Sequence, residues 1–291
     1  MSYGNDSLMG NGHAGSAPAA GNGLIRERGS TDAIVWALRS EPGEVRPHNE
    51  DFAATKPPLF MVADGLGGHD GGEVASRIAA HTVIDSWSEA SYPLSQAMRS
   101  SLRKANAAVF GAAYEYNHQG MATTITALAL DGSAAVIAHV GDSRAYLVRN
   151  GRAEQLTNDH SQVAEMLRRG LLTPEQAASH PARSVLTRCV GLTPAVSVDI
   201  MRRPFLRGDI FILCTDGLWD MVSRQEIGEI SAGLSTESSP SDIEKIVDQM
   251  VDTALERGAA DNVTAVVVLA IESSPPVNPP SGGLFRRWMH R

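Results

Sequence analysis

The sequence predicts a single α+β domain built on antiparallel sheets. Short apolar runs bounded by turn residues recur along residues 31–272, and such runs are typical of buried strands. Asp-Gly, Gly-Asp and Asn-Gly pairs at 131–132, 141–142 and 150–151 follow several of these runs and indicate hairpins. Helical patterns come in pairs rather than after every strand, so the order is not that of a parallel βαβ sheet.

Seven segments have strand patterns, in chain order 33–38, 59–63, 123–130, 134–140, 145–148, 210–214 and 263–271. Helical spacing is seen at 73–87, 95–116, 162–169, 224–231 and 241–257. A further helix is expected to begin after Thr173, which would cap it with Pro174 at its first position. Residues 158–191 are polar with little strand pattern, and we expect them to form a mobile flap over the domain.

The composition excludes several classes of protein. The chain has 291 residues, of which 43% are apolar, enough for a sizeable core. The formal net charge of −8 argues against nucleic-acid binding, which requires clustered Lys and Arg. No run approaches the ~18–20 apolar residues that a membrane-spanning helix needs. With only Cys189 and Cys214, both expected to be reduced, the chain suits a cytoplasmic protein, and we expect a monomer.

The two ends of the chain differ from the segment between them. Residues 1–30 are rich in Gly, Asn, Ser and Ala and predict a disordered tail. Residues 273–291 form a Pro/Gly-rich linker and a basic-aromatic tail, for which a docking peptide, a membrane-surface anchor and a frayed end are all open alternatives. We therefore place the functional domain at 31–272.

Four acidic motifs lie where strand-like runs pass into loops. They are Arg-Pro-His-Asn-Glu-Asp at 46–51, Asp-Gly-Leu-Gly-Gly-His at 64–69, Thr-Asp-Gly at 215–217 and Asp-Asn-Val-Thr at 261–264. Any one of them alone is explained by an ordinary turn. Together they gather carboxylates, which are hard-oxygen ligands for Mg²⁺ or Mn²⁺.

A basic side chain accompanies the carboxylates. Arg46 offers a fork of donors suited to phosphate oxygens, although a surface salt bridge to Glu50 is an alternative. Two divalent ions ~3.5–4 Å apart can make hydroxide available near neutral pH. The combination predicts a dinuclear phosphate-ester hydrolase.

The motifs resemble those of the PPM family of metal-dependent protein serine/threonine phosphatases, also called protein phosphatases type 2C. Besides the four motifs, the resemblance includes Met-Ala-Thr-Thr at 121–124, Val-Gly-Asp-Ser-Arg-Ala-Tyr at 140–146, Leu-Thr-Asn-Asp-His-Ser at 156–161 and Cys-Thr-Asp-Gly-Leu-Trp-Asp at 214–220. It runs in order across residues 31–272, in the pattern of the bacterial members.

The resemblance implies a fold and a set of site residues. The fold would be two packed antiparallel sheets flanked by helices on both sides, an α-β-β-α sandwich with metals at one end. Two Mn²⁺ or Mg²⁺ ions would be bound by Asp64, the Gly65 carbonyl, Asp216 and Asp261, with Glu50 and Asp51 acting largely through water. Asp142 would join Asp216 in holding a third, weaker ion, and Arg46 would bind the substrate phosphate.

The implied reaction is a direct hydrolysis of phosphoserine or phosphothreonine. A metal-bridging hydroxide would attack phosphorus in line, while Arg46 and the metals stabilise the charge on the oxygens. Leu66 stands where many eukaryotic members have histidine, so His69 is the first candidate for the general acid and His48 the second. Neither cysteine has the neighbours of a phosphatase nucleophile.

Two other functions remain open at this point: a catalytically inactive phosphoprotein-binding scaffold and a two-metal hydrolase of a small phosphoester. The intact acidic set argues against the scaffold, whereas the charge of the chain does not exclude a small substrate. For the leading hypothesis, the partners are phosphorylated Ser/Thr proteins and a bacterial-type Ser/Thr kinase that the enzyme opposes.

Overall fold

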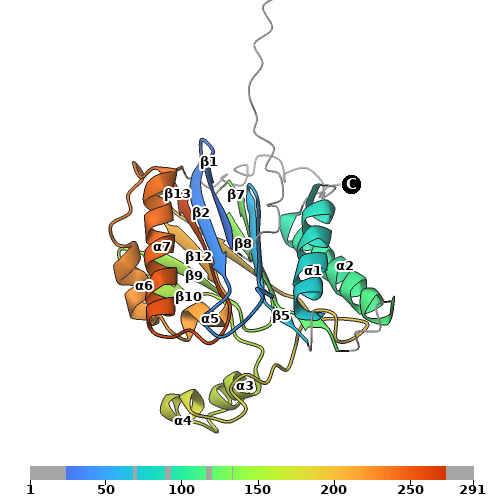
Figure 1. The fold of residues 1–291 in the computed structure, drawn as a ribbon. Helices are drawn as coiled ribbons and strands as arrows, with labels where there is room; N and C mark the ends of the chain where they lie inside the picture. Colours follow the sequence, from blue (N-terminus) through green and yellow to red (C-terminus); the bar gives the residue numbers. More distant parts are fainter. Residues whose placement is uncertain (1–23, 68–70, 89–92, 116–119, 133, 273–291) are drawn as a thin grey trace, which may run out of the picture.

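Two antiparallel sheets pack face to face, and helices cover both outer surfaces (Figure 1). The computed structural model describes residues 24–67, 71–88, 93–115, 120–132 and 134–272. This arrangement confirms the predicted α+β class and the α-β-β-α sandwich. No helix in these ranges has both the length and the apolar composition to cross a membrane.

The larger sheet has six strands and carries the C-terminal helices on its outer face. Its spatial order is β1 (Ile25–Ser30), β2 (Ile34–Glu41), β13 (Val263–Ala270), β12 (Ile210–Cys214), β9 (Arg144–Arg149) and β10 (Arg152–Gln155). The helices on this side are α5 (Asp216–Trp219), α6 (Arg224–Ser231) and α7 (Pro240–Glu256). Along β13, odd-numbered residues pack toward the helices and residues 266, 268 and 270 toward the second sheet.

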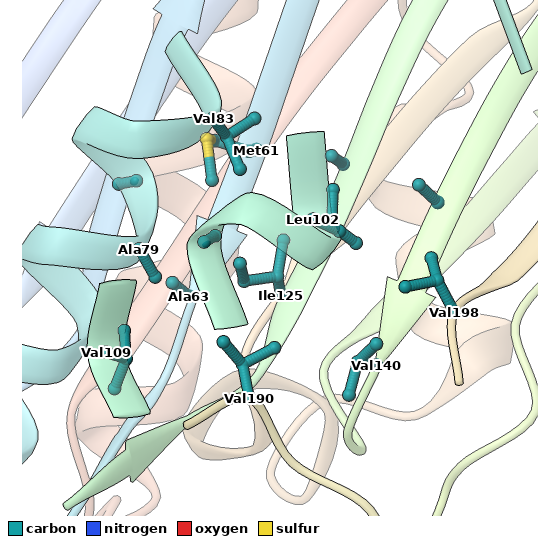
Figure 2. Close-up of a cluster of buried hydrophobic side chains, with 14 of the residues drawn as sticks. Met61, Ala63, Ala79, Val83, Leu102, Val109, Ile125, Val140, Val190 and Val198 are labelled. Carbon is teal, nitrogen blue, oxygen red and sulfur yellow. The ribbon is translucent and has the colours of Figure 1, made fainter. Parts of the chain in front are cut away.

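The second sheet has five strands and is covered by two long helices. Its order is β11 (Asp199–Pro204), β8 (Ala134–Val140), β7 (Ile125–Asp131), β4 (Leu59–Ala63) and β3 (Phe52–Lys56). The helices α1 (Gly71–Ser88) and α2 (Leu94–Glu115) bury Val83 and Leu102 against Met61 of β4 and Ile125 of β7 (Figure 2). A short ribbon of β5 (Gly65–Leu66) and β6 (Ala122–Thr123) extends this sheet at one end.

The predicted flap is a small helical excursion. The helices α3 (Gln162–Arg168) and α4 (Pro174–Ala178) project from the end of the sandwich where α5 and β5 lie (Figure 1). Thr173 caps α4 as predicted: its hydroxyl accepts from Gln176 N, and the Gln176 side chain accepts from Thr173 N.

The prediction of a disordered tail over 1–30 is wrong for residues 25–30, which form β1. This strand pairs with β2 and alternates half-buried and exposed residues. Arg26 and Arg28 form ion pairs with Asp248 and Glu244 on α7. Because those partners are more than 200 residues away, the sequence pattern shows only an unexplained run of charges. The rest of that tail, 1–23, and the C-terminal segment 273–291 lie outside the described residues.

Candidate active site

The predicted carboxylates meet at one end of the sandwich. Asp64 directly follows β4, and Asp216 begins α5 directly after β12. Burial raises the pKa of Asp64 well above its ordinary value, and repulsion from four other carboxylates adds to the shift. Those four belong to Asp216, Asp51, Asp142 and Asp261. The convergence that the motifs predicted is therefore present among aspartates from five separate segments.

The other aspartates of this group have related environments. Burial raises the pKa of Asp142 to about 7, with Asp216 as the strongest repelling neighbour. Burial likewise raises the pKa of Asp216 to about 6, with Asp261 adding to the shift. Burial also raises the pKa of Asp51 well above its usual range. A desolvated cleft whose carboxylates repel one another favours a cation between them or protonation of some of them.

Glycines bring backbone into the same cleft. A Cβ atom on Gly65 would lie 2.2 Å from the Gly72 carbonyl oxygen and 2.6 Å from that of Glu50, so only glycine fits beside Asp64. A Cβ on Gly72 would lie 2.7 Å from Glu50 Oε2, which places the Glu50 carboxylate against the first turn of α1.

Two threonines hold the Asp64 backbone. Thr124 Oγ1 accepts from Asp64 N at 2.9 Å, and Thr123 Oγ1 donates to Asp64 O at 2.8 Å. Both threonines are fully buried. The sequence interpretation of these residues as braces of the cleft is confirmed.

Arg46 lies beside the carboxylates and is paired with one of them. Its Nη2 donates to Asp261 Oδ2 at 2.8 Å. Although burial opposes the charge, Asp261, Glu50 and Asp64 together raise the pKa of Arg46 above its ordinary value. Its side chain is 48% exposed, so donors of the fork remain accessible from solvent. The alternative of a salt bridge to Glu50 is replaced by an ion pair to Asp261.

Asn262 is a functional candidate that the sequence interpretation missed. Its Oδ1 accepts from Glu50 N at 2.8 Å, and its Nδ2 donates to His48 O at 2.9 Å. A Cβ on Gly217 would lie 2.1 Å from the Asn262 carbonyl oxygen. Asn262 thus holds the backbone of the 46–51 motif through its side chain and packs against the Thr-Asp-Gly motif through its carbonyl group. Its position next to Asp261 was the available signal, but an amide that bonds only backbone leaves no pattern in the sequence.

The sequence interpretation named His69 and His48 as candidates for the general acid and His160 as a structural residue. His48 is exposed in the loop of the first motif, and His69, the first candidate for the general acid, lies outside the described residues. His160, which the sequence suggested to be structural, is buried: its Nδ1 accepts from Gly141 N at 3.0 Å, and its Nε2 lies 3.1 Å from Asp199 Oδ2.

The cleft fits divalent cations by the chemistry of its donors. Within the described ranges, no three His, Cys, Asp or Glu side chains are already drawn together around a single ion position. The aspartates nevertheless repel one another across a shared desolvated space, and the approach of Gly72 to Gly65 shows close-packed backbone beside it. Oxygen donors of this kind suit Mg²⁺ or Mn²⁺ rather than softer metals.

Comparison with known proteins gives the family. The protein phosphatase 2C family model matches residues 48–266. The serine/threonine phosphatase stp of Listeria innocua is 37% identical over 242 residues, which cover 79% of this chain and 94% of that protein. The crystal structure of the Mycobacterium tuberculosis phosphatase PstP/Ppp superposes with a TM-score of 0.74 at 33% identity, covering 82% of this chain and 99% of that one.

A second similar solved structure contains metal ions. The catalytic domain of PstP in complex with two manganese ions matches with a TM-score of 0.73 at 31% identity, covering 82% of this chain and 99% of that one. The fold and the acidic cleft thus define a metal-dependent hydrolase class. The chain belongs to the protein phosphatase 2C, or PPM, family and is a protein serine/threonine phosphatase.

Proposed function

We propose that this phosphatase hydrolyses phosphoserine and phosphothreonine in proteins by direct attack of water, in the cleft formed by Asp64, Asp216 and Asp261. The observation that carries the proposal is that the desolvated carboxylates of Asp64 and Asp216 lie together with those of Asp51, Asp142 and Asp261 and are repelled by them. Such an arrangement stabilises bound divalent cations and has no evident structural benefit of its own.

The ion-binding roles are assigned from the positions of the residues. Asp64, the Gly65 carbonyl, Asp216 and Asp261 would hold two Mn²⁺ or Mg²⁺ ions, with Glu50 and Asp51 acting through water. Asp142 and Asp216 would hold a weaker third ion. When bound, the ions supply a water activated for attack on phosphorus and neutralise charge on the phosphate oxygens. The presence of two manganese ions in the related PstP structure supports a site for two ions.

The remaining roles belong to side chains around the cleft. Arg46 is anchored at Asp261 and half exposed, so its free donors are suited to orient the substrate phosphate. His69, with His48 as the alternative, would protonate the leaving hydroxyl of serine or threonine. The flap helices α3 and α4 lie at the same end of the molecule and would influence which phosphoproteins enter.

The substrates define the partners. Phosphoserine and phosphothreonine are products of a Ser/Thr kinase, so we propose that a kinase of this class supplies the substrates. Residues 25–272, which include β1, would carry the whole activity.

The test is turnover by the metal-stripped full-length protein after addition of Mn²⁺. We expect hydrolysis of p-nitrophenyl phosphate and of a phosphothreonine peptide, both abolished by EDTA, with the higher kcat/KM for the peptide. Binding of the peptide without turnover would indicate a scaffold. Turnover of p-nitrophenyl phosphate with no activity on phosphopeptides would indicate a hydrolase of small phosphoesters.

A further inference from the structure

A buried chain of hydrogen bonds ends on one oxygen of Asp51. Thr215 Oγ1 and Thr264 Oγ1 lie 2.7 Å and 2.6 Å from Asp51 Oδ2. Both threonines are fully buried, and Asp51 is 4% exposed. Because a carboxylate oxygen accepts, both hydroxyl protons point toward Oδ2. Among the described residues, Oδ1 receives no hydrogen bond.

The direction of every bond in this chain follows from the first two. Thr264 uses its one hydroxyl proton on Asp51, so Ser40 Oγ, 2.7 Å away, must donate to Thr264 Oγ1. Ser40 Oγ in turn accepts from Asn49 Nδ2 at 2.9 Å. Asn49 Oδ1 accepts from Asp51 N at 3.1 Å, which returns the chain to its starting residue. One consistent arrangement of donors therefore defines the rotation of each group.

These hydrogen bonds also join segments that are distant in the sequence. Ser40 lies on β2, Thr264 on β13, and Thr215 in the turn between β12 and α5. Thr264 N donates to Thr215 Oγ1 at 3.2 Å, which ties the two threonines to each other. Thr215 directly precedes Asp216. The two hydroxyls that bond Asp51 thus come from the third and fourth acidic motifs.

We propose that Thr215 and Thr264 are positioning residues. Their hydroxyls donate to Asp51 Oδ2 and fix the orientation of the carboxylate, so that Oδ1 faces the divalent-ion site. Ser40 and Asn49 fix the rotation of the Thr264 hydroxyl and extend the same function. The proposal rests on the proposed function, because it takes Asp51 as part of the ion site. Residues that orient a ligand from behind contribute strongly to metal affinity.

The test compares Thr264→Val and Thr264→Ser in the full-length chain. Valine keeps the shape of threonine and removes the hydroxyl, whereas serine keeps the hydroxyl. Isothermal titration of the metal-stripped protein with Mn²⁺ should show a Kd about 10-fold higher for Thr264→Val, and a Kd close to wild type for Thr264→Ser. Thermal unfolding of the metal-free proteins is measured in parallel.

Thr126→Val is the matched control. Thr126 is a fully buried strand threonine whose hydroxyl bonds Ser143 O at 2.9 Å and lies near His139 Nδ1, away from Asp51. This variant should lose stability and keep the wild-type Mn²⁺ Kd. An equal loss of Mn²⁺ affinity in Thr126→Val and Thr264→Val would overturn the proposal, because general destabilisation would then explain both.

Ser40→Ala keeps the proposal testable if Thr264→Val does not fold. Ser40 does not touch Asp51, so its loss should raise the Mn²⁺ Kd less than the loss of the Thr264 hydroxyl does, but measurably. If Thr264→Val folds, a wild-type Kd in that variant would overturn the proposal. If it does not fold, a wild-type Kd in Ser40→Ala would do so. Failure of the proposed function has a different signature: the wild-type protein itself would bind no Mn²⁺.

Discussion

His139 and His160 stack with their ring centroids 4.7 Å apart, next to the turn that carries Asp142. His139 is fully buried, and its Nε2 lies 3.2 Å from the Asn158 carbonyl oxygen. Burial, with repulsion from the neighbouring His160 adding to the shift, lowers the pKa of His139 to about 3. The folded protein therefore holds this imidazole neutral across the physiological range.

The lowered pKa of His139 predicts a pH dependence of stability. As pH falls below about 6.5, the unfolded chain binds a proton that the folded protein does not, so stability is lost between about pH 6.5 and pH 3. At pH 5 the loss from this residue is about 2 kcal/mol. Urea unfolding in EDTA at pH 7.5 and pH 5 should show a change in unfolding free energy that is more favourable to the folded state by this amount in His139→Gln than in the wild type, because the raised pKa values of Asp142 and Asp216 act equally in both proteins. The same pH-dependent change in both proteins would contradict the assignment.

Gly217 is a residue whose replacement should disturb the cleft by volume alone. A Cβ there would lie 2.1 Å from the Asn262 carbonyl oxygen, whereas a Cβ on Gly111 in α2 would meet nothing within 4 Å. Gly217→Ala should destabilise the protein by about 1–3 kcal/mol and reduce Mn²⁺-dependent turnover. Gly111→Ala should be stabilising by up to about 1 kcal/mol, since it replaces a helix-interior glycine.

Urea unfolding and turnover of p-nitrophenyl phosphate, measured for both glycine variants, check this pair of expectations. Equal stability of the two variants would mean that the close approach of the Thr-Asp-Gly and Asp-Asn-Val-Thr loops is not required.

At the scale of elements, β1 should act as a stabilising strap on the larger sheet. All of β1 pairs with residues 35–40 of β2, and Arg26 and Arg28 form ion pairs with Asp248 and Glu244 of α7. Deletion of residues 1–30 should lower Tm relative to a deletion of residues 1–23, by about 2–4 °C for each kcal/mol of stability lost. Differential scanning calorimetry of both truncations measures this. Equal Tm values would show that β1 contributes nothing to the stability of the domain.

The sequence predicted every central strand and delimited none of the four edge strands, although the hairpin signal at Asn150-Gly151 indicated a strand where β10 lies. Apolar runs such as 134–140 and 210–214 match β8 and β12 because central strands are buried on both faces. The edge strands are β1, β10, β3 and β11. Three of them expose charged residues, and β3 has only Phe52 as a bulky apolar residue. Their strand character comes from a neighbour that the local sequence does not contain.

The same division holds for the site. The aspartates were predictable because each stands in a short motif next to a strand end. Thr215, Thr264 and Asn262 lie in the same motifs, but their roles depend on contacts with residues more than 40 positions away. A hydroxyl or an amide has no spacing rule that indicates such a partner, so these roles required the structure.

For the whole molecule, the sandwich brings one end of each sheet together, and the motifs meet there although they span residues 46–264. Such a site links metal binding to folding, since the unfolded chain cannot gather these carboxylates. Saturating Mn²⁺ at about 100 times its Kd should stabilise the folded protein by about 2.7 kcal/mol for one site. The Tm difference between Mn²⁺ and EDTA should be largely lost in Asp216→Asn.

An equal Mn²⁺-dependent Tm shift in wild type and Asp216→Asn would mean that the ions stabilise the protein from some other place. A shift of opposite sign would mean that the unfolded chain binds the metal more tightly.

The central claim is that aspartates from separate loops form one divalent-ion centre that hydrolyses phosphoproteins. Mn²⁺ titration of the metal-stripped wild-type and Asp64→Asn proteins, with heat of binding and phosphothreonine-peptide turnover recorded on the same samples, tests it most directly. We predict saturable binding and turnover for the wild type and loss of both in Asp64→Asn, with an unchanged far-UV circular dichroism spectrum. Full Mn²⁺ stoichiometry and a wild-type rate in Asp64→Asn would contradict the claim.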